Sequence, residues 1–388
     1  MSVTDNGAFR FWCFVGLPLV VIIYACFHQG NYYTGLVNTF GIYIILVASL
    51  NLVNGFSGIF SMGHAAFMAI GAYAAAFCTL SPNIKKSFLP GLPPFIQNLR
   101  LPITVGMLAG GIAAALVALV VGICVLRMKG HYLSVATLGL IIIVRSVLDN
   151  GDKFTNGARG ITGLPNYANT WTIYGTALVV IYLLHRLLSS GMGRELVAMR
   201  DDYTAARAMA VNAMGRRVAA FAISAFFAGV GGVLWGHMQS VISGKFYYYD
   251  LSFRIVQTSI IGGMYTLSGA FVGPLVMIAI PEFLRPIEAG FRLGGLEFPQ
   301  MFGLSKLVMS GFLIVLIIFR RQGIMGNSEI IIKSIFSRET YRAAVNPREY
   351  AALFALLREK WRGLRGRGLP RKGLLRGPSQ RPGGKRNG

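Results

Sequence analysis

The chain has 388 residues, of which 54% are hydrophobic and only 13% are charged. Soluble domains contain about a quarter charged residues, so this composition excludes an ordinary water-soluble fold. The formal net charge is +23, but the part from Arg320 to the C-terminus alone has 17 Lys and Arg against 4 Asp and Glu, a net +13. The basic character therefore belongs largely to a tail, which argues against a nucleic-acid partner for the apolar body.

Apolar segments that are long enough to cross a bilayer recur along the chain. A membrane-spanning helix needs about 20 mostly apolar residues. Such segments are predicted near residues 11–28, 36–54, 60–80, 103–126, 132–149, 172–188, 217–241, 268–286 and 304–319. A tenth segment, 252–264, is too short to cross as a straight helix and is predicted to be broken or re-entrant. The sequence thus predicts an all-α fold, a polytopic transmembrane helical bundle of about ten membrane segments.

Basic residues in short loops predict the orientation, because they collect on the cytoplasmic side of the membrane. The loop 186–217 contains several arginines, and the connection 127–129 contains two more basic residues. Both loops are expected in the cytoplasm, which with ten crossings of an inner (plasma) membrane places both termini there. The basic residues of the Pro-rich loop 85–100 then lie outside.

Two glycine-rich stretches interrupt the helical pattern, at residues 55–63 and 261–269. In transporters, paired interruptions flank the substrate path, because backbone groups freed from a helix must face protein or water. The candidates for the path are the polar residues around the first stretch: Asn51, Asn54, Ser57, Ser61 and His64. The alternative for each is a hydrogen bond that packs two helices together.

The predicted cytoplasmic loop 190–216 contains a segment, 193–212, that is rich in helix-forming residues. Its apolar side chains are expected on one face of a short helix, and its charged side chains in solvent. The apolar set is Met199, Ala206, Met209 and Ala210, and the charged set is Arg200, Asp201 and Asp202. Such a helix suits docking into a groove of a partner protein. An ordinary interfacial helix is the alternative.

The sequence has few features that would indicate an enzyme. It has no GxxxxGK[ST] phosphate-binding loop, so any ATP hydrolysis must come from another subunit. The four cysteines and five histidines are scattered, so neither a metal site nor a Ser-His-Asp arrangement is predicted. The chain is therefore expected to be non-catalytic and to need no cofactor.

Two other classes of membrane protein remain open at this point. An ion-coupled carrier would require an essential buried acid, for which Glu282 and Asp149 are the few candidates. A membrane scaffold would use its basic tail to bind lipid or RNA.

Four segments resemble, in the same order, the permeases of branched-chain amino-acid ABC importers. They are residues 49–73 (SLNLVNGFSGIFSMGHAAFMAIGAY), 127–139 (RMKGHYLSVATLG), 157–163 (GARGITG) and 269–274 (GAFVGP), and the resemblance runs from about residue 30 to 320. It implies a permease that pairs with a second, homologous permease, binds two ATP-binding subunits and receives substrate from a periplasmic or extracellular solute-binding protein. Urea, amides and other small polar solutes are alternative substrates within this class.

The resemblance also implies that the segment Arg194 to Asn212 is the coupling helix that receives the ATPase stroke. The residues expected to take part are Arg194, Arg200, Asp201, Asp202, Ala205, Ala206, Met209 and Asn212. Where the family loop reads Ala-Ala-acidic-x-x-Gly, this chain has Arg207 and Ala210, which reverses a charge and replaces a turn-permitting glycine.

A second departure follows the Thr-Leu-Gly of residues 137–139. Many members of the family have a Glu a few residues later, near an Arg; here that position is Ile142. The remaining Arg145 is expected to pair with Asp149, one helical turn later.

Residues 1–320 are assigned to the transmembrane permease domain and 321–388 to a basic cytoplasmic tail. In the tail, residues 347–365 show an apolar stripe surrounded by basic residues, which predicts an amphipathic helix lying on anionic membrane lipids. The end of the tail is rich in Gly, Pro and Arg and is predicted to be disordered. Packing of the helix against the permease's own cytoplasmic face or an ATPase is the alternative.

Overall fold

The structure is a computed structural model, and it describes residues 31–128, 131–290, 292–293, 296–297, 303–320 and 322–326. All of these lie in one of the two units into which the chain divides, Phe14–Ile331. The predicted first span, 11–28, and the predicted tail helix, 347–365, lie outside the described residues.

Long apolar helices dominate the described part of the chain. Six of them have the length and composition to cross a membrane, as the pattern of apolar segments predicts. They are α3 (Asn31–Asn51, continued by η3, Leu52–Phe56), α7 (Ile103–Val125), α8 (His131–Asn150), α10 (Thr170–Ser189), α13 (Ala213–Gln239) and α15 (Gly269–Glu288). The total of about ten membrane segments stays a prediction.

Three further apolar helices are shorter: α4 (His64–Thr79), α14 (Tyr249–Gly262) and α16 (Leu304–Phe319). The segment predicted at 60–80 becomes helical only at His64, and residues 57–63 before it are not helical. The 14 residues of α14 confirm that this segment forms a helix too short to cross the bilayer alone.

Short elements connect these helices. The helical ones are α5 (Pro82–Phe88), α6 (Pro94–Gln97), α9 (Asp152–Thr155), η4 (Gly157–Arg159), α11 (Gly191–Asp201) and α12 (Tyr203–Ala208). Strand β1 (Ile161–Thr162) pairs antiparallel with β2 (Val241–Ile242), and β3 (Arg292–Leu293) pairs antiparallel with β4 (Leu296–Glu297).

The core of the bundle forms where α4, α7 and α13 pack against one another. Small residues make this possible, since glycines let helix backbones approach closely. A methyl group added at Gly71 would lie 2.4 Å from the carbonyl oxygen of Gly229, and one at Gly110 would lie 2.6 Å from the carbonyl oxygen of Gly71. Helix α3 is almost wholly buried between α10, α13, α14 and α15. Helices α3 and α13 therefore form the centre of the bundle, and α8 and α16 pack around it on α4 and on α15.

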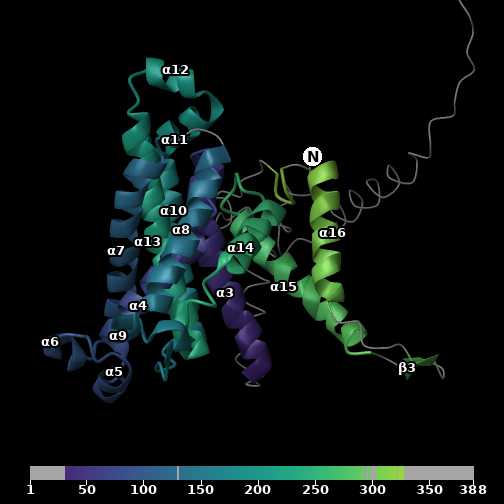
Figure 1. Cartoon of the computed structure of the whole chain (residues 1–388). Helices are drawn as coiled ribbons and strands as arrows, with labels where there is room; N and C mark the ends of the chain where they lie inside the picture. Colours follow the sequence, from purple (N-terminus) through teal and green to yellow (C-terminus); the bar gives the residue numbers. More distant parts are fainter. Residues whose placement is uncertain are drawn as a thin grey trace, which may run out of the picture. The chain divides into compact units, whose positions relative to one another are not determined.

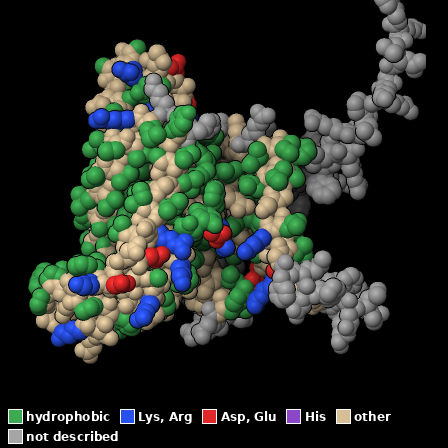
Figure 2. All heavy atoms as spheres, in the orientation of Figure 1, with side chains coloured by type: hydrophobic (Ala, Val, Ile, Leu, Met, Phe, Trp, Pro, Cys, Tyr) green, Lys and Arg blue, Asp and Glu red, His purple; other side chains and the backbone are tan. Residues whose placement is uncertain are grey.

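The two ends of the bundle have different elements. Helices α11 and α12 lie at one end, and α5 and α6 lie at the other (Figure 1). Hydrophobic side chains cover most of the lateral face between these ends, and basic side chains gather at both of them (Figure 2). An apolar band between two charged ends is what a bilayer requires of a spanning bundle.

The loop at the α5–α6 end is folded around a buried cation. Lys85 is fully buried, and its Nζ donates hydrogen bonds to the carbonyl oxygens of Ile96, at 3.1 Å, and of Leu99. Burial lowers the pKa of this ammonium from its ordinary value. The Pro-rich loop between α4 and α7 therefore has an ordered centre.

Candidate functional site

The first glycine-rich stretch is a real break in a membrane helix. Helix α3 passes into the π-helical turn η3, which ends at Phe56, and the chain then runs without helical structure until α4 begins at His64. Gly58 has a φ of +67°, a backbone conformation that favours glycine. Single π-helical turns of this kind are frequent at functional sites.

Side chains hold the broken stretch in one conformation. Asn54 accepts a hydrogen bond from the Ser61 amide at 2.9 Å and donates one to the Ser61 carbonyl oxygen at 3.1 Å. The next residue, Met62, donates its amide hydrogen to the Thr137 hydroxyl at 3.0 Å and accepts a hydrogen bond from the Ser252 hydroxyl. Helices α8 and α14 therefore both fasten the first interruption.

The second glycine-rich stretch breaks the chain between α14 and α15. Here the two helices touch through their backbones: a methyl group at Gly262 would lie 2.0 Å from the carbonyl oxygen of Gly269, and one at Gly273 would lie 2.2 Å from that of Thr258. Gly263 has a φ of +116°. Only glycine fits such a close reversal.

The two interruptions meet at what we call the interruption joint, formed by Asn51, Gly55, Ser259, Met264 and Thr266. Asn51 donates to the Thr266 carbonyl oxygen at 2.9 Å and accepts from the Ser259 hydroxyl at 2.5 Å. A methyl group at Gly55 would lie 1.8 Å from the carbonyl oxygen of Met264. Segments more than 200 residues apart thus form one polar contact inside the bundle.

All five residues that the sequence analysis placed along the path are buried. Asn51, Asn54 and Ser57 have partners within this subunit, with the Ser57 hydroxyl donating to the Val53 carbonyl oxygen at 2.7 Å. His64 Nε2 lies 3.0 Å from the Ser49 hydroxyl. The structure therefore brings these groups to the joint and its surroundings, and their access to water stays a prediction.

Sequence reasoning missed the partners of these residues. Ser259 and Thr266 complete the joint, and Thr137 and Ser252 fasten the first interruption. The sequence contains part of the information needed to find them, because Thr266 lies within the second glycine-rich stretch. Ser252 and Ser259 lie inside the segment predicted to be re-entrant.

The predicted cytoplasmic loop forms two helices, because the chain turns at Asp202. The carboxylate of Asp202 accepts hydrogen bonds from the amides of Thr204 and Ala205, at 2.8 and 3.0 Å, and so caps α12. Asn212 caps α13 by accepting a hydrogen bond from the Gly215 amide at 3.1 Å. The local fold thus depends on two polar caps that the sequence analysis had assigned to coupling.

The prediction that four apolar residues share one exposed docking face is wrong for two of them. Met199 and Ala206 are buried within this subunit, at 2% and 5% exposure, whereas Met209 is 81% exposed. Ala210 is also exposed, and its φ is +62°, in the left-handed region. Met199 faces the bundle because α11 packs on α10 and α13, and Ala206 does so because α12 packs on α11 and α13. Met209 and Ala210 follow the last residue of α12 and lie outside.

The remaining coupling candidates are mostly exposed. Arg194, Asp201, Asp202 and Ala205 all belong to this exposed group, together with Asn212. Arg207, where this chain departs from the family pattern, is also exposed. Its guanidinium lies 5.9 Å from the ring centre of Tyr203.

Arg200 connects this loop to both interruptions. A methyl group on Gly58, in the first interruption, would lie 3.0 Å from Arg200 Cγ. The Arg200 guanidinium lies 5.2 Å from the ring centre of Tyr265, in the second interruption. One side chain of α11 therefore touches both of the breaks that form the joint.

A hollow of about 850 Å³ lies at the same end of the bundle. It brings Tyr203 and Arg217 of the α11–α13 region close to Gly58 and to Arg127. Arg127 and Met128, from the first of the two loops predicted to be cytoplasmic, and Tyr203 and Arg217, from the second, therefore lie on one side of the bundle, as the charge pattern predicts.

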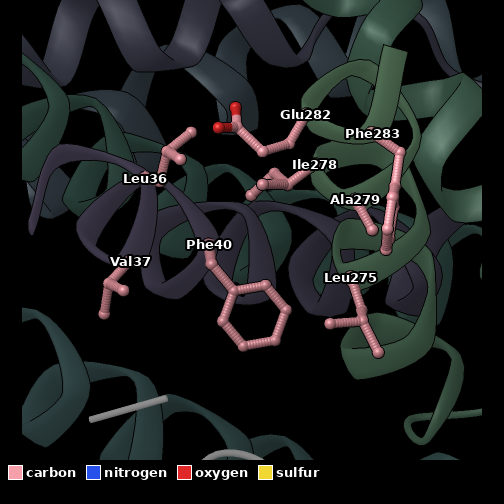
Figure 3. A pocket seen from close by; sticks show the side chains of 8 residues that line it. All are labelled: Leu36, Val37, Phe40, Leu275, Ile278, Ala279, Glu282 and Phe283. Carbon is pink, nitrogen blue, oxygen red and sulfur yellow. The ribbon is translucent and has the colours of Figure 1, made fainter. Parts of the chain in front are cut away.

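A second hollow, of about 360 Å³, lies between α3 and α15 and is almost entirely apolar (Figure 3). Phe40 and Leu275 form part of its wall, and the carboxylate of Glu282 lies at one edge, away from Leu275. Glu282 accepts a hydrogen bond from the Tyr32 hydroxyl at 2.6 Å and pairs with Arg285 at 3.4 Å.

The predicted ion pair on α8 is confirmed. Arg145 Nε lies 3.3 Å from Asp149 Oδ2. The Arg145 guanidinium also lies 4.1 Å from the ring centre of Tyr248, the residue that precedes α14. Both acids that an ion-coupled carrier would use, Asp149 and Glu282, are thus paired with arginine.

Comparisons with known proteins agree with this arrangement. A family model described as a branched-chain amino acid transport system permease component matches residues 32–320. The high-affinity branched-chain amino acid transport system permease protein LivM of Escherichia coli K12 is 27% identical over 318 residues, which cover 73% of this chain and 68% of the relative. No solved structure matches the chain significantly.

Two further relatives carry related names. The LivM permease protein of Salmonella typhimurium is 28% identical over 318 residues, with the same coverage of both chains. A probable branched-chain amino acid transport permease protein LivM of Methanocaldococcus jannaschii is 24% identical over 320 residues, covering 75% of this chain and 92% of the relative. Because the family model matches residues 32–320, well over half of the chain, the chain belongs to the family of permease components of branched-chain amino acid transport systems.

Proposed function

We propose that this chain is one of two permease subunits of an ATP-driven importer that carries branched-chain amino acids across the inner membrane. The observation that supports this most strongly is the family match over residues 32–320, which includes both interruptions and the loop between α10 and α13. The chain is then a multi-pass, non-catalytic subunit with both termini in the cytoplasm. A second, homologous permease, two ATP-binding subunits and a solute-binding protein complete the transporter.

Arg200 supplies a route from ATP hydrolysis to the membrane interior. In this proposal the exposed surface of α12, with Met209 at its end, docks on an ATP-binding subunit. A displacement of α11 then moves the Arg200 side chain against Gly58 and Tyr265. Because these two residues lie in different interruptions, their relative shift changes the interruption joint. Two packed arrangements of the joint would give the alternating access that import requires.

The five polar residues of the first interruption belong to this gate in the proposal. In one state they make the internal hydrogen bonds described above, and in the other they line the substrate path. A polar group at membrane depth that changes its partner avoids the cost of being left unpaired.

Reconstitution of the complete transporter tests the assignment. The chain is purified with the products of neighbouring transport genes, placed in liposomes and supplied with a liganded binding protein. Leucine uptake should require ATP inside the vesicles and should stop when the binding protein is omitted. Uptake that follows an ion gradient without ATP would overturn the proposal in favour of a carrier. ATP-dependent uptake of urea or amides with no leucine uptake would overturn the substrate class alone.

The Arg200→Ala variant tests the route through α11, with Arg186→Ala as the control, because Arg186 is an exposed arginine in the last turn of α10 and lies outside the coupling segment 194–212. The Arg200 change should lower leucine uptake by about tenfold while ATP hydrolysis continues. The control should retain both activities. Equal uptake by both variants would remove Arg200 from the route.

A further inference from the structure

A third hollow, of about 410 Å³, lies where the start of α14 meets α3 and the end of α13. Its lining combines one acid, one base and several aromatic side chains. The residues are Tyr43, Trp235, Gln239, Val241, Phe246, Asp250, Leu251 and Arg254. This volume falls within the range of small-molecule sites, about 300–1,000 Å³. The lining differs from that of the apolar hollow between α3 and α15.

The charged pair of this hollow is open to a ligand. Asp250 Oδ2 and Arg254 Nε lie 3.0 Å apart, and the two side chains are 70% and 44% exposed. Exposed pairs with this spacing on a helix contribute little to stability, so each group can accept another partner. An arginine has five donors in a planar fork that suits a carboxylate, and an aspartate accepts from an ammonium group.

The position along the bundle makes these exposed charges unusual. Tyr43 lies twelve residues into α3, which at the rise of an α-helix is about 18 Å from the end of that helix. Trp235 and Gln239 lie within the last five residues of α13, so the hollow lies between the middle of the bundle and its α5–α6 end, inside a hydrocarbon core that is about 30 Å thick. Charged side chains interrupt the hydrophobic lateral face in the region that α14 occupies in Figure 1 (Figure 2). Ionisable residues at this depth mark transport paths, because lipid does not solvate them.

The apolar lining complements the charged pair. The ring of Tyr43 meets that of Trp235 edge to face, with centroids 6.1 Å apart, and Leu251 is buried beside them. An aliphatic side chain placed against these groups leaves water, which favours binding in proportion to the apolar area covered. Phe246 is 53% exposed and forms part of the rim.

We propose that this hollow binds the translocated α-amino acid as a zwitterion, with Asp250 receiving the ammonium group, Arg254 the carboxylate, and Tyr43, Trp235 and Leu251 the aliphatic side chain. The inference rests on the proposed import function and adds to it the place where substrate is held during transport. It also assigns different roles to two similar ion pairs: Asp250–Arg254 binds substrate, and Glu282–Arg285 does not.

Protection of a cysteine tests the site directly. In the assembled transporter, the four native cysteines are replaced by serine and Phe246→Cys is introduced at the rim. Its reaction with a small aqueous thiol reagent is measured without nucleotide. L-Leucine should slow the reaction. 3-Methylbutylamine lacks the carboxylate and 4-methylpentanoate lacks the ammonium group, so each should protect only at about tenfold higher concentration or more.

Charge-removing variants identify the partners. Arg254→Gln and Asp250→Asn should each weaken leucine protection by about tenfold or more, because a charge-assisted hydrogen bond is lost. Arg254→Lys keeps the charge but not the planar fork and should have an intermediate effect. The matched control, Glu282→Gln, removes an acid from the other pair and should leave protection unchanged. Assembly of each variant is checked by size-exclusion chromatography.

Two readouts separate this proposal from the import function. If the unsubstituted transporter takes up leucine with ATP but leucine never protects the cysteine, the site is wrong and the function stands. If leucine protects and uptake fails, the site stands and the function is wrong. Equal loss of protection in Glu282→Gln and Arg254→Gln would also overturn the site.

Discussion

The hydroxyl of Ser259 donates a hydrogen bond of 2.5 Å to the side-chain oxygen of Asn51, which lies 208 residues earlier in the chain. The amide group of the same Asn51 donates to the Thr266 carbonyl oxygen at 2.9 Å. One asparagine thus satisfies a hydroxyl of α14 and a carbonyl group of the break between α14 and α15. Because the site is buried, water cannot replace it.

Asn51→Ala should therefore destabilise the subunit by about 2 kcal/mol, since it leaves a buried hydroxyl and a buried carbonyl without their partner. The measurement is thermal unfolding of the purified permease in detergent. Asn169→Ala is the control, because Asn169 is exposed and its side chain makes no capping hydrogen bond at the start of α10. Equal melting temperatures for the two variants would show that the joint adds nothing to stability.

Met209 is the position that tests docking of α12, since it is 81% exposed at the end of that helix. Met209→Glu should leave folding unchanged and weaken association with the ATP-binding subunit by about tenfold, because it places a charge in an apolar contact. Met209→Leu keeps an apolar side chain and should associate normally. The readout is the amount of ATP-binding subunit that copurifies. Normal copurification of the glutamate variant would remove α12 from the interface.

Ala206→Glu has a different expected outcome, because Ala206 is only 5% exposed within the subunit. Its charge would be buried against the bundle, so the variant should fail in folding before docking can be measured. Low yield of Ala206→Glu beside normal yield of Met209→Glu would separate these two effects.

Ala210 holds a backbone conformation that glycine adopts more easily, with φ at +62°. Ala210→Gly should stabilise the turn between α12 and α13 by about 0.5 to 1 kcal/mol, after subtraction of the entropy that glycine loses on folding. Ala205→Gly, within α12, should destabilise it by about 1 kcal/mol. Trypsin cleavage after Arg207 reports the opening of this turn, and it should be slower in the first variant and faster in the second. Faster cleavage of Ala210→Gly would contradict the strain at this position.

The fold was largely predictable from the sequence, because apolar segments of bilayer length have no other stable arrangement. The helix α16 was predicted with its bounds as observed, and α14 was correctly recognised as too short. The start of α4 was placed too early, because composition does not show that Asn54 holds Ser61 outside a helix. The local pair of Arg145 and Asp149 was predictable from helical spacing.

The site was predictable only as a list of residues. Both glycine-rich stretches were identified, but their contact through Gly55 and Met264 depends on tertiary packing that spacing cannot reveal. The prediction of one apolar docking face on the loop 190–216 was wrong for a related reason. Met199 and Ala206 pack on this subunit's own helices, and a helical pattern cannot tell an internal contact from a partner's surface.

The last prediction concerns the contact between α4, α7 and α13, on which the whole bundle depends. Gly71→Ala places a methyl group 2.4 Å from the carbonyl oxygen of Gly229, which belongs to a buried helix backbone and cannot rotate away. The helices must move apart, and overpacking of this kind costs about 1 to 3 kcal/mol. Gly175→Ala is the matched control in α10, because nothing lies within 4 Å of the added methyl group. Alanine there should be neutral or stabilising by about 0.5 to 1 kcal/mol, since it restricts the unfolded chain. Thermal unfolding of the two variants should therefore shift in opposite directions or in one variant only. If the Gly71→Ala and Gly175→Ala variants have the same melting temperature, the close glycine contact does not determine the packing of these helices.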